Sequence, residues 1–352
     1  MMKINVALLP LALLYDLATR IRNYLYLHNV VKVFHPPVKT IAIGNLSMGG
    51  SGKTPVAEYL IRLLSEEFGN IAYLSRGYKR KSKGFVIAGD EINYRNIGDE
   101  AFQVYRKFPN ATIMVSNNRK EAIEYFSEKT ENQGLIILDD ALQHRQVRCG
   151  LNILLTSYHR PYFQDFIFPA GSLRESKKYA SLPDIILITK CPPSLSQKQQ
   201  DDFLSKIRPL PHQSVFFTFL RYLPLYPAFS HENIDLQSLR NFHIITFTGI
   251  ADTRPLEEYL NSVCKKVIPV KFQDHKEFCK KNIQRVAETF KHCQAEKKII
   301  VTTEKDFSRI KGLETEKYLE NLPLFILPVE TAFYGNTGNL FKQKILDYVG
   351  KN

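Results

Sequence analysis

Short, mostly apolar runs recur along the chain and predict buried strands. The runs at residues 135–138 and 185–188 are wholly apolar and show no alternation with polar residues. Strands that are buried on both faces are typical of parallel sheets with helices on both sides. Similar runs lie at 38–43, 71–75, 111–115 and 151–155, and apolar residues at helical spacing follow the first of them. The pattern therefore predicts an α/β fold with a mostly parallel sheet flanked by helices.

The same alternation of strand and helix returns in the C-terminal part of the chain. Residues 192–200 are polar, and beyond them strands are predicted at 243–248 and 298–303, with a helix at 255–263 between them. A chain of 352 residues is long for one domain and suits two. We therefore expect an N-terminal helical segment over residues 1–35, a larger domain over 36–222 and a smaller α/β domain over 223–352.

Residues 4–28 predict a helix with one apolar face and one polar stripe. Its apolar run ends at Asp16, well short of the roughly 18 residues that a transmembrane helix needs. A signal peptide would share the early part, but no cleavage site of the A-x-A type follows. Polar or basic residues flank the apolar face at Lys3, Asp16, Arg20, Arg22 and Asn23. We expect a helix that lies on a membrane surface, with an ordinary core helix as the alternative.

A glycine-rich loop separates the first predicted strand from the first predicted helix. It ends in Gly49-Gly50-Ser51-Gly52-Lys53-Thr54-Pro55 and matches the pattern G-x-x-x-x-G-K-[ST], except that Ser47 replaces the first glycine. The backbone N–H groups of such a loop bind phosphate oxygens, and the N-terminus of the helix adds its positive dipole end. Lys53 would reach the β- and γ-phosphates, and the Thr54 hydroxyl would bind Mg²⁺. The loop therefore predicts a nucleoside triphosphate site; a turn that ends in this tripeptide by chance is disfavoured by the flanking strand and helix.

Two carboxylates, Asp139 and Asp140, follow directly after the apolar strand at 135–138. A carboxylate at that end of a buried strand is the usual Mg²⁺ partner of a phosphate loop. Gln143 and His144 follow within reach of the same pocket. A basic run at residues 76–83 is either a solvated loop or a grip on an anionic substrate.

Two further residues have ordinary explanations when they are considered alone. Asp99 stands where a predicted helix begins, and a helix N-cap explains it. His275 belongs to a lone Asp-His pair between predicted elements, where a loop is the commoner setting. Local sequence alone therefore leaves both residues without a chemical role.

The net charge narrows the class of partner. It is +13 at pH 7, with an isoelectric point near 9.3, which favours nucleic acid, a membrane surface or a phosphorylated substrate. The five cysteines are odd in number and form no C-x-x-C pair, as expected of reduced thiols in the cytoplasm. Disulfide-stabilised and zinc-binding classes are therefore excluded.

Taken in order, the motifs resemble those of the tetraacyldisaccharide 4′-kinases of the lipid A pathway. That family also has a non-glycine residue at the position of Ser47. Two small departures are Ala141, where the family commonly has glycine, and Ser172, where it commonly has proline. The phosphate loop is followed by Ser75-Arg76-Gly77-Tyr78, Gly98-Asp99-Glu100, Asp139-Asp140-Ala141-Leu142-Gln143-His144, Pro169-Ala170-Gly171-Ser172-Leu173-Arg174-Glu175, Asp274-His275 and Thr303-Glu304-Lys305-Asp306.

The resemblance implies an enzyme that transfers the γ-phosphate of ATP to the 4′-hydroxyl of tetraacyldisaccharide 1-phosphate, which yields lipid IVA. It implies peripheral attachment to the cytoplasmic face of the bacterial inner membrane, and a smaller domain that closes over the nucleotide. Asp99 would be the general base, oriented by His275, and Lys53 would serve the transferred phosphate. Mg²⁺ would be held by Thr54, Asp139, Asp140 and Glu175. Candidates for the substrate are Arg76, Lys79, Arg119, Gln143 and His144.

Three other classes of protein share part of this pattern. A phosphate-loop GTPase or ATPase of the metal-insertion or partitioning type would hydrolyse nucleotide without phosphorylating a lipid. A nucleotide-gated interaction protein on the membrane would need no general base. A nucleic-acid ATPase would explain the positive charge but would leave the N-terminal apolar helix without a place, so we expect no nucleic acid partner.

Overall fold

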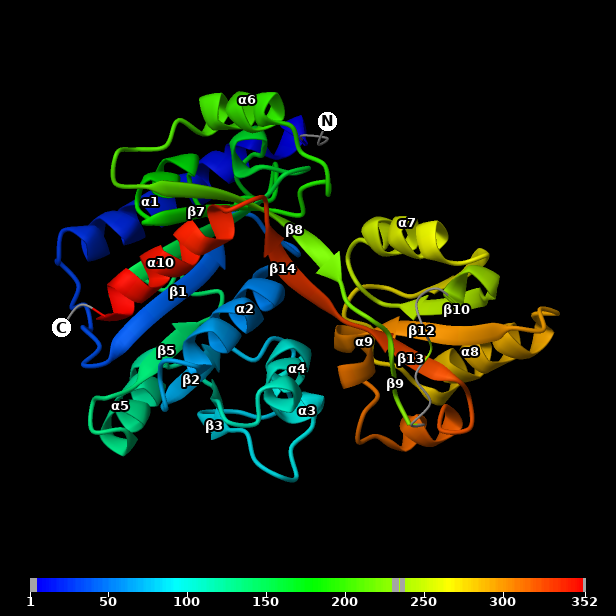
Figure 1. Ribbon diagram of the computed structural model, residues 1–352. Coiled ribbons are helices and arrows are strands. Elements are labelled where there is room, and N and C mark those ends of the chain that lie inside the picture. Colours follow the sequence, from blue (N-terminus) through cyan, green and yellow to red (C-terminus); the bar gives the residue numbers. More distant parts are fainter. Residues whose placement is uncertain (1–4, 230–233, 235–237, 351–352) are drawn as a thin grey trace.

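The computed structural model describes residues 5–229, 234 and 238–350, and it contains two sheets (Figure 1). The larger sheet has nine strands in the order β14-β8-β7-β6-β1-β5-β2-β4-β3. All neighbours from β8 to β4 are parallel, whereas the edge strands β14 and β3 are antiparallel to their neighbours. Its strands are β1 (Lys39–Asn45), β2 (Ile71–Ser75), β3 (Val86–Ile87), β4 (Thr112–Val115), β5 (Leu135–Leu138), β6 (Leu151–Ser157), β7 (Ile185–Thr189), β8 (Ser214–Tyr222) and β14 (Val329–Phe333).

Helices cover both faces of this sheet, as the wholly apolar strands require. Ile41 and Ile43 of β1 belong to one buried cluster and Ala42, between them, to the other. Residues of α2, α4 and α10 complete the first cluster, and residues of α5 and α6 join the second. The expected α/β fold with a mostly parallel sheet is confirmed. The helices are α2 (Lys53–Ser65), α3 (Tyr94–Ile97), α4 (Asp99–Lys107), α5 (Arg119–Lys129), α6 (Gln197–Ile207) and α10 (Thr337–Gly350).

The smaller sheet has five strands in the order β11-β10-β12-β13-β9, and only β9 is antiparallel to its neighbour. Apolar clusters fill both of its faces. We call residues 226–327 the small lobe and the rest of the described chain the large lobe. The elements of the small lobe are β9 (Tyr226–Pro227), β10 (His243–Thr248), α7 (Arg254–Val263), β11 (Lys266–Lys271), α8 (Lys280–His292), β12 (Lys298–Thr303), α9 (Glu304–Ser308) and β13 (Leu324–Leu327).

The chain crosses between the lobes twice. It leaves the large sheet after β8 and returns after β13, so that β14 pairs with β8 and α10 packs on the large sheet (Figure 1). The expected segment 223–352 is therefore wrong at its far end, since residues 329–350 belong to the large lobe. The amphipathic pattern of α10 predicts a helix but does not specify which sheet it covers.

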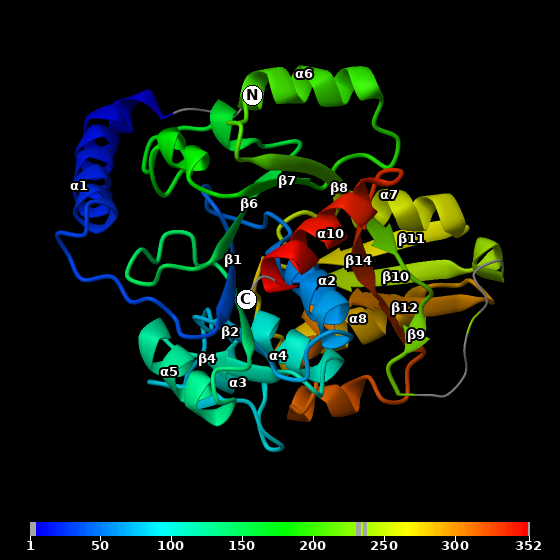
Figure 2. The ribbon, with the colours of Figure 1, turned by 60° about the vertical axis from the view of Figure 1, so that its left-hand side comes forward.

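The N-terminal helix α1 (Leu9–Leu27) lies at the edge of the large lobe, away from the small lobe (Figure 2). The face that it buries is small or polar and consists of Ala12, Asp16, Thr19 and Asn23. Its large apolar side chains are exposed instead, namely Leu11, Leu13, Leu14, Leu17, Ile21, Tyr24 and Leu27. The helix is therefore inverted relative to a core helix, which buries its apolar face. Lys3, which we expected to flank it, lies outside the described residues.

No helix in the described ranges combines the length and the apolar character needed to span a bilayer. Short 3₁₀ helices complete the structure at Val6–Leu8, Tyr162–Gln164, Lys177–Ser181, Ser238–Asn241 and Glu314–Tyr318.

Neighbouring residues of α10 provide a test of its place in the large lobe. Phe341 is fully buried and contacts Phe216 of β8 with a ring-centroid distance of 5.3 Å, whereas Leu340 is 62% exposed. Phe341→Ala should destabilise the large lobe by about 3–5 kcal/mol because it leaves a cavity. Leu340→Ala should change stability by no more than about 0.5 kcal/mol. Urea unfolding of both variants checks this, and equal effects would contradict the assignment of α10.

Candidate active site

The loop between β1 and α2 presents a row of free backbone N–H groups. Within the described ranges, no N–H group of residues 49–53 donates to a protein acceptor. Gly49 and Gly52 adopt φ values of +110° and +81°, which glycine takes without strain. Ser47, where the common pattern has glycine, forms an isolated bridge with Leu173, so ordinary extended backbone suits that position. Unpaired N–H groups at the start of a helix form a phosphate site.

The end of β7 holds this loop from behind. Thr189 Oγ1 donates to the carbonyl oxygen of Ser51, and Lys190 Nζ donates to that of Gly50, both at 2.7 Å. The loop carbonyls are thus engaged with the protein while its N–H groups remain free. Thr189 and Lys190 therefore support the phosphate loop from the end of β7.

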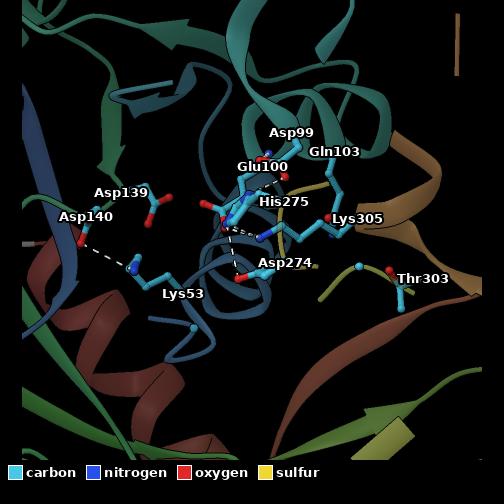
Figure 3. Close-up of polar contacts among 12 residues, drawn as sticks. Lys53, Asp99, Glu100, Gln103, Asp139, Asp140, Asp274, His275, Thr303 and Lys305 are labelled. Atoms are coloured by element: carbon cyan, nitrogen blue, oxygen red, sulfur yellow. Dashed lines mark hydrogen bonds and ion pairs between the residues drawn. The ribbon is translucent and has the colours of Figure 1, made fainter. Parts of the chain in front are cut away.

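Lys53 points from the start of α2 toward the two carboxylates that follow β5 (Figure 3). Its Nζ lies 3.6 Å from Asp140 Oδ1 and 3.3 Å from Asn45 Oδ1. Arg174 Nη1 donates to the other oxygen of Asp140 at 2.7 Å. Asp140 itself has a φ of +49°, a conformation that is strained for a non-glycine residue and that clusters at functional sites.

Two carboxylate oxygens beside Lys53 are buried without a hydrogen-bond partner, namely Asp139 Oδ1 and Asp140 Oδ1. A buried anionic oxygen without a partner is costly, and a divalent cation would satisfy both. Among the described residues, no three His, Cys, Asp or Glu side chains gather as a metal site. Mg²⁺ suits this arrangement because it commonly takes one or two carboxylates and completes its shell with phosphate oxygens and water. The residues present therefore fit Mg²⁺.

The two carboxylates have opposite electrostatic environments. Burial raises the pKa of Asp139 to about 6, with the charge of Glu100 adding to the effect and that of Lys53 opposing it. Tyr73 donates a hydrogen bond of 2.7 Å to Asp139 Oδ2. Burial also raises the pKa of Asp140, but the charges of Lys53 and Arg174 outweigh it and lower the pKa below its ordinary value. Of the two carboxylates, Asp139 is therefore the one whose negative charge is not compensated by nearby positive charge.

Asp99 is the first residue of α4 and is held by two residues of the small lobe, of which Figure 3 labels His275. Its Oδ2 is 2.8 Å from His275 Nδ1 and accepts a hydrogen bond of 2.8 Å from Arg309 Nε. Burial raises the pKa of Asp99, but the His275 hydrogen bond and the charges of Lys305, Arg309 and His275 outweigh it and lower the pKa. The N-cap explanation is wrong, because Gly98 occupies the N-cap position.

Charged side chains also join the two lobes beside Asp99. Lys305 Nζ of α9 lies 2.8 Å from Glu100 Oε1 of α4. Lys107 Nζ of α4 lies 2.7 Å from Glu58 of α2 and 2.9 Å from Glu304 of α9. The carboxylate of Asp99 is therefore positioned where α4 and α9 meet.

A second cluster is cationic and lies beyond the carboxylates. Arg119 is buried and donates to the Asp139 carbonyl oxygen at 2.8 Å. Nε2 of His144 is buried without a partner, and burial followed by the charges of Arg119, Arg76 and Arg22 lowers the His144 pKa to about 4. An anion bound beside this imidazole would provide a partner for the unpaired nitrogen and would reduce the repulsion among the arginines.

One predicted metal ligand, Glu175, has other contacts than we expected. Glu175 is fully buried, and its oxygens accept hydrogen bonds from Asn23, Gln143 and Arg145. It therefore ties α1 to the rest of the lobe, and the structure does not place it in the metal site. Gln143, a candidate for the substrate, donates to Glu175 Oε1 at 3.1 Å and to the carbonyl oxygen of Asn45 at 3.0 Å, so it lies beside the phosphate loop. Lys79, another candidate for the substrate, is exposed and lines the cavity beside Asp99.

Sequence reasoning missed several residues that complete the site. Arg174 lies within a motif that we quoted, but nothing marked its contact with Asp140. Arg309 stands just beyond the motif that ends at Asp306, and no local pattern distinguishes it from a surface arginine. The others that we missed are Tyr73, Glu100 and Lys305, each of which lies next to or within a quoted motif.

Fold and site together define a phosphate-loop protein that binds a nucleoside triphosphate and places a buried carboxylate near it. The family model described as "Tetraacyldisaccharide-1-P 4'-kinase" matches residues 4–349, and the chain belongs to this family. The expected family is therefore confirmed.

Named relatives and a solved structure agree. A tetraacyldisaccharide 4′-kinase of Flavobacterium psychrophilum is 40% identical over 97% of this chain and 96% of its own length. One from Bacteroides thetaiotaomicron is 38% identical over 99% and 94%. The crystal structure of an "apo" form of LpxK from Aquifex aeolicus in complex with ATP aligns with a TM-score of 0.73 at 27% identity, over 97% of this chain and 98% of that one.

The pKa values of Asp139 and Asp140 are shifted in opposite directions, so the same substitution should change the stability of the protein in opposite directions at the two positions. A raised pKa means that ionised Asp139 destabilises the fold above about pH 6, and this cost disappears toward pH 4. Asp139→Asn should therefore stabilise the ligand-free protein at pH 7.5, by about 1–3 kcal/mol, and less at pH 4.5. Asp140→Asn should destabilise it at pH 7.5, because its lowered pKa contributes stability above its ordinary pKa.

Thermal melts of the two variants at both pH values check this. A loss of stability in Asp139→Asn at pH 7.5 would contradict the view that Asp139 lacks a counter-charge. Added Mg²⁺ with ATP should stabilise the wild type more than Asp139→Asn, since the variant has lost a ligand.

Proposed function

We propose that this protein is the ATP-dependent kinase that phosphorylates the 4′-hydroxyl of tetraacyldisaccharide 1-phosphate and forms lipid IVA. The observation that carries the proposal is the pairing of a phosphate loop with an ionised, oriented carboxylate at the lobe interface, in a chain of this family. Simple nucleotide hydrolysis by a GTPase or ATPase is not favoured, because the relatives that match the whole chain are named as kinases of this lipid.

The phosphate loop and Lys53 would bind and align the triphosphate. Transfer of a phosphoryl group depends mainly on alignment and on stabilising the charge of its oxygens. The free N–H groups of residues 49–53 and the Nζ of Lys53 supply that charge from one side. Mg²⁺, when bound by Thr54, Asp139 and Asp140, supplies further positive charge to the phosphate oxygens. The ion pair between Lys53 and Asp140 would be exchanged for the phosphates when ATP binds.

Asp99 would accept the proton of the attacking hydroxyl. Its Oδ2 is occupied by His275 and Arg309, whereas within the described residues Oδ1 accepts only the N–H of Glu100, and Asp99 lines the cavity. A carboxylate fixed through one oxygen presents the other in a constant direction, which is what a general base requires. His275 would act through Asp99 and not on the substrate.

The cationic cluster would bind the 1-phosphate at the far end of the substrate. Arg76, Arg119 and His144 gather near the site, and the unpaired Nε2 of His144 provides a free position for a hydrogen bond. Arginine binds phosphate with more than one hydrogen bond, and two arginines would match the charge of a phosphomonoester. The cluster lies toward α1, since the charge of Arg22 reaches His144.

Helix α1 would hold the enzyme on the membrane. Its exposed leucines would enter the headgroup region, and Arg20 and Arg22 would remain at the surface to face anionic lipid. The acyl chains of the substrate would then stay in the bilayer beside the cationic cluster. ATP and reduced thiols favour the cytoplasmic face of the inner membrane, and these contacts use the positive charge without nucleic acid.

The kinase activity is tested with ATP and an acylated disaccharide 1-phosphate, followed by mass analysis of the lipid. We expect the substrate to gain one phosphoryl group at the 4′-position. Lys53→Ala should lower kcat by about 10²–10³-fold in a folded protein, since one phosphate contact is lost. Arg76→Ala should raise KM for the lipid about tenfold and leave KM for ATP unchanged.

Arg254→Ala is the matched control for the arginine variant, because Arg254 is exposed and pairs only with Asp252. It should behave as the wild type. Hydrolysis of ATP without any phosphorylated lipid would return the protein to the hydrolase class and overturn the proposal.

Attachment to the membrane is tested by substitutions on the exposed face of α1. The triple variant Leu13→Ser, Leu17→Ser and Ile21→Ser should keep its fold, because these residues are 67%, 55% and 54% exposed. It should bind anionic vesicles about 1,000-fold more weakly, since each buried Leu or Ile side chain contributes about 1.5 kcal/mol or more. Leu340→Ser, equally exposed on α10, is the control and should float with vesicles like the wild type. Unchanged flotation of the triple variant would rule out α1 as the anchor.

A further inference from the structure

Arg309 is a basic side chain that is almost fully buried near the site. It follows α9 at its C-cap and is 1% exposed. Arginine is almost never buried unless it is paired, because the loss of hydration costs several kcal/mol. Its burial therefore requires partners, and the structure provides them on both sides of the guanidinium.

One side of the guanidinium is anchored in the small lobe. Nη1 donates to Asp306 Oδ1 at 2.9 Å and to the carbonyl oxygen of Gly249 at 2.8 Å. Asp306 is itself fixed, since it accepts hydrogen bonds from Gly249 N and Thr303 Oγ1. These contacts leave the guanidinium one orientation and direct its remaining nitrogens out of the small lobe.

The other side reaches Asp99 of the large lobe. Nε donates to Asp99 Oδ2 at 2.8 Å, and Nη2 lies 2.7 Å from the same oxygen. Nη2 has no other polar partner among the described residues, and Arg309 lines a cavity of about 170 Å³ together with Asp99, His275 and Tyr78. The small lobe thus fixes one oxygen of a large-lobe carboxylate, and the cavity lies beside both.

We propose that Arg309 is a positioning residue for phosphoryl transfer: it holds Asp99 ionised and directs the Oδ1 of Asp99 toward the acceptor hydroxyl. The inference rests on the proposed kinase function. In that reaction the acceptor oxygen bonds to the γ-phosphorus of ATP, the bond from that phosphorus to the bridging oxygen breaks, ADP leaves, and the acceptor proton passes to Asp99.

Both lobes contribute to the general base in this arrangement. The large lobe supplies the carboxylate and the small lobe supplies its orientation, through Arg309 and His275. Asp99 is correctly held only while the lobes are together, which ties the base to the closed arrangement. A base that formed independently of closure would also serve water, and water would then compete with the lipid hydroxyl.

The charge around Asp99 sets the expected effect of pH. From the small lobe it faces the positive charges of Arg309 and Lys305 and the ring of His275, and on its own helix it is followed by Glu100. Removal of a positive charge raises the pKa of a carboxyl. Loss of Arg309 should therefore move the acid limb of the rate profile to higher pH. The cavity adds further charged groups at Lys79, Lys81, Arg95 and Glu277.

The test compares Arg309→Met, which removes the charge, with Arg309→Lys, which keeps it. For Arg309→Met we expect kcat to fall about 10–100-fold, KM for ATP to stay within twofold, and the acid limb of kcat/KM to move to higher pH. For Arg309→Lys we expect the acid limb to stay in place and much of kcat to return. A lower Tm in Arg309→Met with wild-type kcat and pH profile would overturn the inference. If Arg309→Met fails to fold, a shifted acid limb in Arg309→Lys would overturn it, because that variant keeps the positive charge.

Lys107→Met is the matched control. It also breaks an ion pair between α4 and α9 but does not contact Asp99, so it should leave the acid limb unchanged. A shift of the acid limb equal to that of Arg309→Met would assign the effect to lobe contact in general and overturn the specific role of Arg309.

A measurement of stability separates this inference from the kinase proposal. In a double-mutant cycle of Asp99→Asn and Arg309→Lys, the changes in unfolding free energy should be far from additive, because the two groups contact each other. Additive changes would overturn the positioning role whatever the activity. If the cycle shows this coupling but the wild-type protein does not phosphorylate the lipid, the kinase proposal alone is overturned.

Discussion

The direction of the strands is the constraint on which this structure depends. Parallel strands place all their carboxyl ends at one edge, so the loops that follow β1, β2, β5 and β7 are neighbours although they are far apart in sequence. The phosphate loop, Arg76, the pair Asp139 and Asp140, and the supporting Thr189 are brought together in this way. The small lobe repeats the device, since its site residues Gly249, His275 and Thr303 follow β10, β11 and β12. The contacts of Asp99 with His275 and Arg309 show that the two edges face each other.

Those parts of the site that are local in sequence could be predicted. The phosphate loop needs glycine, lysine and threonine at fixed spacing, and a carboxylate after an apolar strand has one usual meaning, so Lys53 and Asp139 were found from sequence. The resemblance supplied Asp99 and His275, which local patterns alone would have left as an N-cap and a loop. The fold class followed from strands without alternation, because only burial on both faces tolerates them.

What could not be predicted depends on contacts between distant segments. Arg309 resembles any surface arginine in sequence, and only the meeting of the lobes makes it a buried partner of Asp99. Glu175 was expected to bind metal because it is a carboxylate within a motif, yet Asn23 and Arg145 occupy it. The inverted burial of α1 depends on what covers its polar stripe, and the place of α10 depends on which strand its chain has just left. Each of these features depends on which distant segment packs against the residue or helix, and the periodicity of the sequence does not determine that.

The double crossing between the lobes makes the small lobe an insertion within the large one. The two connecting segments run side by side, since Tyr222 pairs with Val329 and Leu223 N donates to the carbonyl oxygen of Pro328 at 3.0 Å. During synthesis, β8 therefore lacks its partner strand β14 until the whole inserted lobe has been made, and α10 is made later still. The N-terminal elements cannot complete their core alone, because Phe341 and Ile345 come from the last helix. The inserted lobe fills both faces of its sheet mostly with its own residues, with Leu225 and Tyr222 of the connecting segment added on one face. Its ends are adjacent, so it has what a separate folding unit requires. The segment that carries His275 and Arg309 therefore has the requirements for folding by itself, whereas the lobe that binds the nucleotide needs the last helix of the chain.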